Sequence, residues 1–155
     1  MMASMSMLKR SDMWIADSGA SNHVTSSSKG CINKRNATGL THQIVSKSVH
    51  PQCELDKTCV HYDKDGNQVE EVTITDASDL PEGTFNLFSL TRLQKKGWTL
   101  LGNSDYIKLQ KGGNSLLFNI VVSAPKGAQY VGKFSRTGGD EVMRGATNKS
   151  SYLQH

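Results

Sequence analysis

The residues of this chain best suited to chemistry form an Asp-Ser-Gly-Ala segment, Asp17, Ser18, Gly19 and Ala20. The apolar run at residues 13–16 predicts a strand that ends in a tight turn at this segment. A rigid turn can present a carboxylate for general acid–base catalysis, as in an aspartic protease. We expect the Ser18 hydroxyl to hold the turn by a hydrogen bond, Gly19 to let the backbone approach the carboxylate, and Ala20 to keep the site open. The same tripeptide is also common in ordinary turns.

Aspartic proteolysis requires two carboxylates that share one proton, so that one activates a water and the other donates to the scissile carbonyl. The chain contains no second Asp-Ser-Gly or Asp-Thr-Gly, and we expect Asp79 and Asp140, which lack the glycine, also to lack the setting of a strand followed by a turn. An active enzyme would therefore be a homodimer with twofold symmetry in which each subunit supplies Asp17. We expect such a coupled pair to give an acidic to near-neutral activity optimum.

One helix is predicted among the elements that would position this turn. After a breaker cluster at residues 80–83, Leu87, Leu90 and Leu93 recur at helical spacing, and Gly97 ends the pattern. The spacing predicts a short helix over about residues 87–96.

The rest of the chain predicts short strands separated by turn residues. Residues 21–39 are mostly polar and predict a surface loop. The Asp-Gly pair within residues 63–67 predicts a hairpin turn, because its glycine is misplaced for a calcium loop. The regular spacing favours an antiparallel β architecture. The expected strands are residues 58–62, 69–75, 98–101, 106–109, 116–122 and 130–134.

Length and composition predict one soluble domain. The chain has 155 residues, of which 36% are hydrophobic and 21% charged, and no apolar run approaches a membrane span. We expect a flexible N-terminal segment at residues 1–12, a folded domain at residues 13–136 and a polar tail at residues 137–155. The N-terminus lacks the apolar stretch of a secretory signal.

Cysteine content and charge indicate the cellular compartment and the kind of partner to expect. Three cysteines, Cys31, Cys53 and Cys59, are too few for a disulfide scaffold and favour a reducing compartment, hence the cytoplasm. The net charge of +4 comes from scattered Lys and Arg, so no specific nucleic-acid partner is predicted.

Two ordered motifs carry a family resemblance. The segment WIADSGASNHVT at residues 14–25 resembles the protease motif of copia-type LTR retrotransposon polyproteins, whose proteases are retropepsin-like. About 70 residues further on, Leu-Pro at 80–81, FNLFSL at 85–90 and KGW at 96–98 resemble the second conserved stretch of that family. The similarity covers roughly residues 13–136.

The resemblance implies a retropepsin-like closed β-barrel with one short helix, acting as a homodimer. It implies an aspartic endopeptidase that cleaves a retrotransposon polyprotein in the cytoplasm or within virus-like particles, with no cofactor, metal or membrane. Asp17 would be catalytic, with Ser18, Gly19 and Ala20 shaping its loop. The residues implied to pack behind that loop are Asn86, Leu87, Phe88, Ser89 and Leu90.

The sequence departs from the family in the flap, the glycine-rich hairpin that covers substrate in retropepsins. The corresponding interval, residues 44–58, contains no glycine and includes Pro51. Few residues precede the catalytic motif to build a dimer sheet. These departures leave open a catalytically inactive protease-like module that serves dimerisation, assembly or binding. The expected flap tip is Ser46, Lys47, Ser48, Val49 and His50.

Two other kinds of site were considered. His50, Cys53, Cys59 and His61 are zinc-binding residue types, but their spacing matches no standard zinc motif. Ser18 and His23 are residue types of a serine hydrolase, but the chain has no G-x-S-x-G elbow. Neither reading is favoured, and no metal is predicted.

Overall fold

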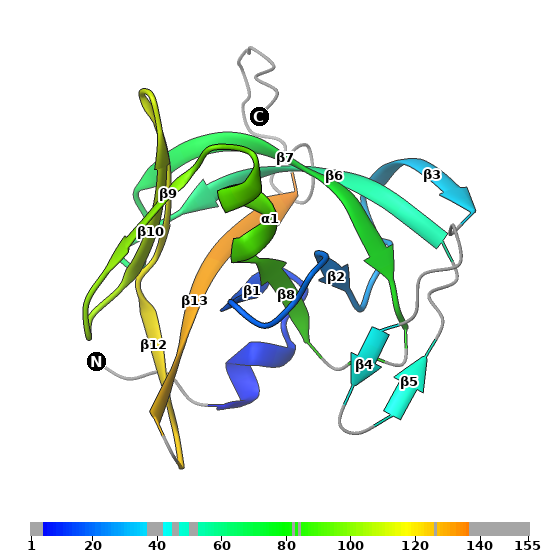
Figure 1. Cartoon of the computed structure of the whole chain (residues 1–155), viewed down its shortest axis with the longest axis horizontal. Coiled ribbons are helices and arrows are strands. Elements are labelled where there is room, and N and C mark those ends of the chain that lie inside the picture. Colours follow the sequence, from blue (N-terminus) through cyan, green and yellow to red (C-terminus); the bar gives the residue numbers. More distant parts are fainter. Residues whose placement is uncertain are drawn as a thin grey trace.

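The computed structural model describes residues 5–36, 42–44, 47–49, 53–81, 83, 85–125 and 127–136. These residues form mostly β-structure, which confirms the fold class expected from the sequence (Figure 1). The helices are the 3-10 helix η1 (Met5–Lys9) and the α-helix α1 (Leu90–Lys95). The strands are β1 (Met13–Asp17), β2 (Val24–Thr25), β3 (Cys31–Asn36), β4 (His42–Ile44), β5 (Lys47–Val49), β6 (Cys53–Tyr62), β7 (Gln68–Asp79), β8 (Asn86–Ser89), β9 (Thr99–Gly102), β10 (Ile107–Lys111), β11 (Asn114–Phe118), β12 (Ile120–Ala124) and β13 (Gly127–Arg136).

The main sheet closes on itself. Its eight strands have the order β12-β13-β1-β8-β2-β7-β6-β3. A further antiparallel pairing joins β13 to β6, with Lys133 opposite Tyr62 and Arg136 opposite Cys59. The strands from β13 to β6 therefore form a closed ring, which β12 and β3 extend at its margins. The closed barrel expected from the resemblance is confirmed.

Strand β1 has neighbours from two distant parts of the chain. Ile15 lies opposite Val131 of antiparallel β13 and opposite Leu87 of parallel β8. The next strand in the chain, β2, does not contact β1 directly, because β8 lies between them and Leu87 also pairs with Val24. The turn after Asp17 thus leaves β1 on one side of β8 and returns on the other.

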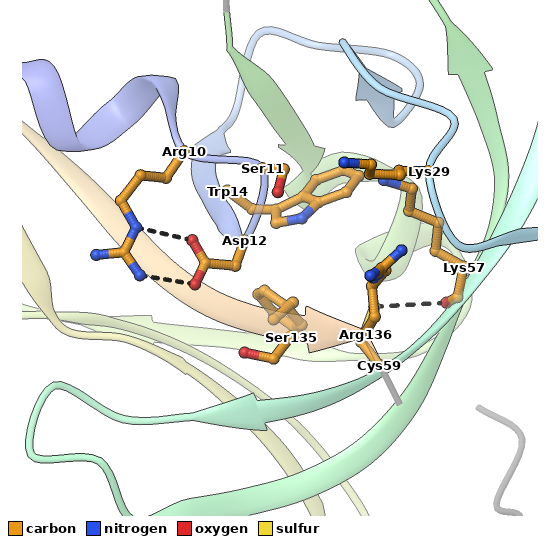
Figure 2. A pocket seen from close by; sticks show the side chains of 10 residues that line it. Arg10, Ser11, Asp12, Trp14, Lys29, Lys57, Cys59, Ser135 and Arg136 are labelled. Carbon is orange, nitrogen blue, oxygen red and sulfur yellow. Dashed lines mark hydrogen bonds and ion pairs between the residues drawn. The ribbon is translucent and has the colours of Figure 1, made fainter. Parts of the chain in front are cut away.

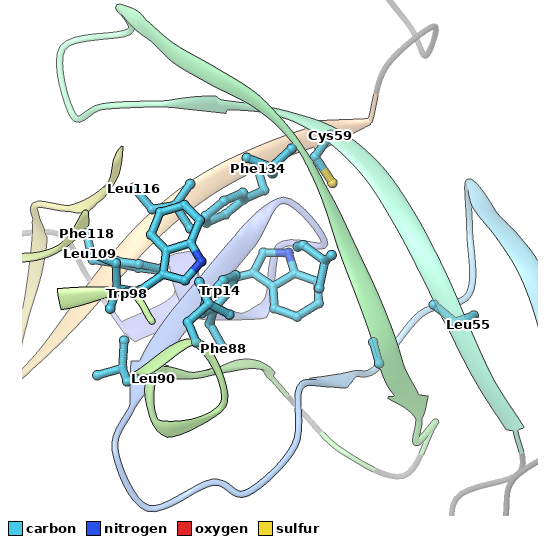
Figure 3. Packing of buried hydrophobic residues seen from close by; sticks show 14 residues of the cluster. Trp14, Leu55, Cys59, Phe88, Leu90, Trp98, Leu109, Leu116, Phe118 and Phe134 are labelled. Atoms are coloured by element: carbon cyan, nitrogen blue, oxygen red, sulfur yellow. The ribbon is translucent and has the colours of Figure 1, made fainter. Parts of the chain in front are cut away.

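Aromatic rings fill the barrel (Figure 3). Phe88 stacks on Phe134 with ring centroids 5.5 Å apart, and Trp14 meets each of them edge-on at 6.4 Å. Gly132 lies against this cluster, since a Cβ at that position would come within 2.8 Å of the Phe118 ring. The rings and the glycine backbone are packed together without space for a methyl group.

The predicted hairpin turn at residues 63–67 joins β6 to β7. The carboxylate of Asp63 accepts the backbone N–H groups of Asp65 and Asn67, each at 2.9 Å, and Gly66 has a φ of +85°. The turn is confirmed. Both strands are longer than predicted, because they also pair with β3 and β2.

The predicted helix over residues 87–96 is wrong at its start. Residues Asn86–Ser89 form β8 instead, and α1 begins after Ser89, whose hydroxyl accepts the N–H of Arg92. Leu90 and Leu93 fill the main core, but Leu87 packs in a second cluster near η1. Parallel pairing with β1 overrides the helical spacing of these leucines.

Two segments expected to be irregular are ordered. Residues 5–12, expected to be flexible, include η1, whose Leu8 is buried in a cluster with Met13 and Ile15. The loop expected at residues 21–39 contains β2 and β3. Residues 1–4 and the predicted polar tail at 137–155 lie outside the described residues.

Two smaller sheets complete the structure. Strands β9, β10 and β11 form an antiparallel meander, and β4 pairs with β5 in a separate hairpin (Figure 1). The strand expected at residues 116–122 is divided at Asn119, whose side chain accepts the backbone N–H of Lys64 at 3.0 Å. No helix in the described part of the chain is long and apolar enough to cross a membrane.

Candidate active site

Asp17 is the last residue of β1 and lies opposite Ser89 of β8. Its half-buried carboxylate accepts the backbone N–H of Gly19 at 2.7 Å through Oδ1. The close approach of the backbone expected at Gly19 is therefore present. Ser18 is exposed, and its hydroxyl makes no hydrogen bond within the described part of the chain, so the role expected for it is not seen.

Ser89 holds the Asp17 loop from behind. Its hydroxyl donates to the carbonyl oxygen of Ala20 at 2.7 Å while accepting the N–H of Arg92 in the first turn of α1. Thr91 donates to the same carbonyl at 3.2 Å. One serine therefore joins the loop, strand β8 and the start of the helix.

His23, which follows the Asp17 loop in the chain, also binds Ser89. The ring is buried, and its Nδ1 accepts the backbone N–H of Ser89 at 2.9 Å. Burial, together with the positive charges of Arg92 and Lys96, lowers the pKa of His23 to about 3. The imidazole is therefore neutral at pH 7 and carries its proton on Nε2. It cannot serve as the base of a Ser18 hydrolase, because the nitrogen that accepts is already engaged.

Asn86 connects both strands that flank β8. Its Oδ1 accepts from the Thr25 hydroxyl at 2.9 Å and from the Ser26 N–H at 3.1 Å. Its Nδ2 donates to the carbonyls of Ser11 and Met13, each at 3.1 Å. The residue is 1% exposed; its bonds to Thr25 and Met13 are buried, and those to Ser26 and Ser11 are partly buried. The backing role implied for Asn86 and Ser89 rests on these contacts, whereas Leu87, Phe88 and Leu90 contribute apolar packing.

Replacing Asn86 with alanine is expected to lower the free energy of unfolding by about 3 kcal/mol, since four backbone and hydroxyl partners, two of them in fully buried bonds, lose their hydrogen bonds. Urea denaturation measures this loss. Asn114→Ala, at a half-exposed position of β11, is the matched control and should change stability by less than about 0.5 kcal/mol. Equal losses in the two variants would contradict the role assigned to Asn86.

An ionic network missed by the sequence analysis extends from the same loop. The guanidinium of Arg92 bonds Asn22 and also Asp76 of β7, at 3.0 Å to the latter. Asp76 in turn pairs with Arg35 of β3. Asp76 has a φ of +58°, at an irregularity in the β6–β7 pairing, so its position could not be read from a strand pattern.

Asp56 anchors the other end of this network. Burial alone would raise its pKa, but hydrogen bonds from the Asp76 N–H and the Asn33 amide, together with Arg35, hold the pKa of Asp56 below its usual value. The carboxylate is thus ionised under ordinary conditions. The network joins α1, β7 and β3 around the segment that follows the Asp17 loop.

Of the residues considered for zinc, His61, Cys53 and Cys59 have other partners, and His50 lies outside the described residues. His61 is buried, its Nδ1 lies 2.9 Å from the Lys133 carbonyl, and its Nε2 accepts the Leu117 N–H at 2.8 Å. Burial lowers its pKa. Cys53 donates to Asp79 at 3.5 Å. No group of three or more His, Cys, Asp or Glu residues suited to a metal ion occurs among the described residues.

The expected flap falls on the β4–β5 hairpin, in which His42 lies opposite Val49 and Ile44 opposite Lys47. Lys47, Ser48 and Val49 form β5. Ser46 and His50 lie outside the described residues.

Fold and site together define a closed β-barrel that presents one carboxylate on a braced turn. The family described as "Pol polyprotein, beta-barrel domain" matches residues 14–98, more than half of the chain. The chain belongs to this family and is a region of a retroelement Pol polyprotein. The match contains both motifs, at residues 14–25 and 80–98, and ends before the last strands of the barrel. Comparison with curated proteins and with solved structures gave no match.

Proposed function

We propose that this domain is an aspartic endopeptidase that cleaves the retroelement polyprotein as a homodimer, with Asp17 of each subunit forming the catalytic pair. The resemblance of residues 14–25 and 80–98 to copia-type proteases motivates the specific activity. The observation that carries it is the half-buried Asp17 carboxylate at the end of β1, in a turn fixed by Gly19 and Ser89.

The bracing of this turn suits the chemistry. An aspartic pair must hold two like charges close enough to share a proton, and repulsion between them would displace carboxylates on loose loops. Here the Gly19 N–H donates to the Asp17 carboxylate, and the Ala20 carbonyl accepts from two hydroxyls. In the dimer, the ionised carboxylate takes a proton from water while the protonated partner donates to the scissile carbonyl oxygen.

A polypeptide substrate would bind across the two subunits, between the paired loops and the β4–β5 hairpins. The reaction needs no metal or cofactor. We place it in the cytoplasm or within virus-like particles, where free thiols at Cys31, Cys53 and Cys59 persist.

The test is cleavage of a diverse peptide pool by the purified protein between about pH 4 and 7, read by mass spectrometry. We expect cleavage that a pepstatin-type inhibitor blocks, with a rate per subunit that rises with protein concentration until dimerisation is complete. Cleavage that the pepstatin-type inhibitor does not block would indicate a mechanism other than aspartic proteolysis. No cleavage at concentrations where sedimentation shows a dimer would favour the alternative, a catalytically inactive module for dimerisation, assembly or binding.

A further inference from the structure

Three nucleophilic side chains lie together on one face of the β3–β6 pairing. Cys31 of β3 is directly opposite Lys57 of β6. Residues placed in this way in an antiparallel pair have Cβ atoms about 4.5–5.5 Å apart. Cys59 follows Lys57 by two residues in β6, so its side chain leaves the same face of the sheet. Cys59 belongs to the main core and Cys31 packs against it, so this face is turned toward the barrel interior.

A cavity of about 420 Å³ gives small molecules access to this cluster. Lys57 and Cys59 both line it beside Trp14 (Figure 2). Lys57 is 5% exposed and Cys59 2%, whereas Cys31 is only half-buried. Cys31 is therefore the thiol of the cluster that a dissolved oxidant meets first.

The environment of Lys57 favours its neutral amine. Its Nζ lies 6.0 Å from the centre of the Trp14 ring, at the limit of a cation–π contact. Burial lowers the pKa of Lys57 and outweighs negative charge on the two thiols and on Asp79, which acts to raise it, while Arg136 lowers it as well. A lower pKa increases the fraction of lysine that carries a free lone pair, which is the form that attacks an electrophile.

The thiol of Cys59 is poorly suited to react. Burial raises its pKa to about 12, and the thiolate is the form that reacts with oxidants and with other sulfur centres. Its position relative to Cys31 is also unsuitable for a disulfide. The two are diagonal neighbours, which are about 7–8 Å apart in a sheet, whereas a disulfide needs Cβ atoms about 3.5–4.5 Å apart. Lys57 is thus the better partner for an oxidised Cys31.

We propose that hydrogen peroxide links Cys31 to Lys57 through a reversible sulfur–nitrogen bond, a sulfenamide. In the first step the Cys31 thiol takes one oxygen atom from peroxide, which gives a sulfenic acid and water. In the second step the lone pair of Lys57 Nζ attacks the sulfur, the S–N bond forms as the S–O bond breaks, and the oxygen leaves as water with a proton from the amine. Sulfur loses two electrons, and one peroxide becomes two waters. Two equivalents of an added thiol restore the free cysteine and lysine and become a disulfide.

The link would join a marginal strand of the barrel to its neighbour. Strand β3 lies at the end of the main sheet, next to β6. The bond would fix β3 on β6 and remove the positive charge of Lys57 from the cavity. Arg35 of the same strand pairs with Asp76 in the ionic network that extends from the Asp17 loop. Oxidation would therefore act on a strand that contributes to this network.

The test is to oxidise the purified full chain with hydrogen peroxide, digest it with trypsin without reductant and analyse the peptides by mass spectrometry. Trypsin does not cleave after a modified lysine, so the sulfenamide should join residues 30–34 to an uncleaved peptide of residues 48–64. The pair should be lighter by about 2 Da, two hydrogens, than the two separate peptides. Dithiothreitol should remove the link and restore cleavage after Lys57.

Three variants assign the link to its two residues. Cys31→Ser and Lys57→Met should each abolish the cross-linked peptide, whereas the matched control Cys59→Ser should retain it. Dimedone, which traps sulfenic acids, should label Cys31 more strongly in Lys57→Met than in the wild-type chain, because the competing amine is absent. The wild-type chain oxidised in urea should give no such peptide, since strand pairing brings the two residues together.

A disulfide between Cys31 and Cys59, recognised by residues 30–34 joined to residues 58–64 after normal cleavage at Lys57, would overturn the proposal. Oxidised Cys31 beside unmodified Lys57, or loss of the link in Cys59→Ser, would also overturn it. Circular dichroism checks that each variant is folded, and Cys31→Ser, at a half-buried position, provides the test if Lys57→Met is not. The readout involves no cleavage by this protein, so its outcome is independent of the proposed protease activity.

Discussion

If the proposed function holds, Asp17→Asn is expected to lower kcat/KM for peptide cleavage by at least about 10³-fold, because the substitution removes both carboxylates of the proposed homodimer. The amide oxygen of asparagine can still accept the Gly19 N–H that now bonds Oδ1 of Asp17. The loop should therefore persist, and the free energy of unfolding should change by less than about 0.5 kcal/mol. Loss of cleavage then reports on chemistry and not on folding.

Mixing this variant with the wild-type chain tests whether one site needs two subunits. When subunits exchange freely and the total concentration is fixed, activity should fall as the square of the wild-type fraction, because heterodimers carry one carboxylate. A linear fall would show that each chain works alone. Ser18→Ala is the matched loop control and should keep most of the activity, since its exposed hydroxyl has no hydrogen-bond partner in the described part of the chain.

Acidification is expected to destabilise the protein through His23. The pKa of this imidazole is about 3 in the folded protein and 6.5 when unfolded, because burial and the charges of Arg92 and Lys96 oppose protonation. Below pH 6.5 the unfolded chain binds a proton that the folded chain does not, so stability falls as pH decreases. The loss should reach about 2 kcal/mol at pH 5 and grow until about pH 3. His61, whose pKa is also lowered by burial, acts in the same direction.

Urea denaturation between pH 7.5 and 4 measures this dependence, and NMR of the His23 ring should show no titration down to pH 5. His23→Asn removes the group and should flatten the curve relative to the wild-type chain. A wild-type stability that stays constant between pH 7 and 5 would contradict the assignment. Since His23 also holds Ser89, the same protonation would loosen the support of Asp17. The expected acidic range of activity therefore has a lower limit set by this histidine.

Local chemistry made parts of the fold predictable from the sequence. The turn at residues 63–67 depends on an aspartate and a glycine within five residues, and the Asp17 loop on a short apolar strand followed by Gly19. The hydrogen bonds within these two turns, from Asp63 to its neighbours and from Gly19 to Asp17, are local in sequence. Hydrophobic spacing alone could not separate strand β8 from helix α1, because β8 exists through its pairing with β1, more than 65 residues earlier in the chain.

Dependence on residues far apart in the chain also explains which contacts of the site could not be predicted from the sequence. Nothing local distinguishes Asn86 from any other asparagine, yet its four hydrogen-bond partners lie in or next to the two strands beside β8. Arg92 and Asp76 likewise meet only after the helix, β7 and the loop have assembled. Leu8 lies in a Met- and Ser-rich stretch without apolar periodicity, and its burial depends on Met13 and Ile15 of the barrel.

The strand order also determines when the barrel can form during synthesis. Strand β1 is made before its neighbours β8 and β13, which follow about 70 and 115 residues later. Closing such long loops is slow, and the early strands have unpaired edges until it happens. Because β13 pairs with β1, β6 and β12, a nascent chain that has not yet reached residue 136 lacks the strand that joins these three. Strand β1, which carries Asp17, is thus made before both of its neighbours and gains its pairing with β13 last. Folding of this region should therefore lag behind its translation.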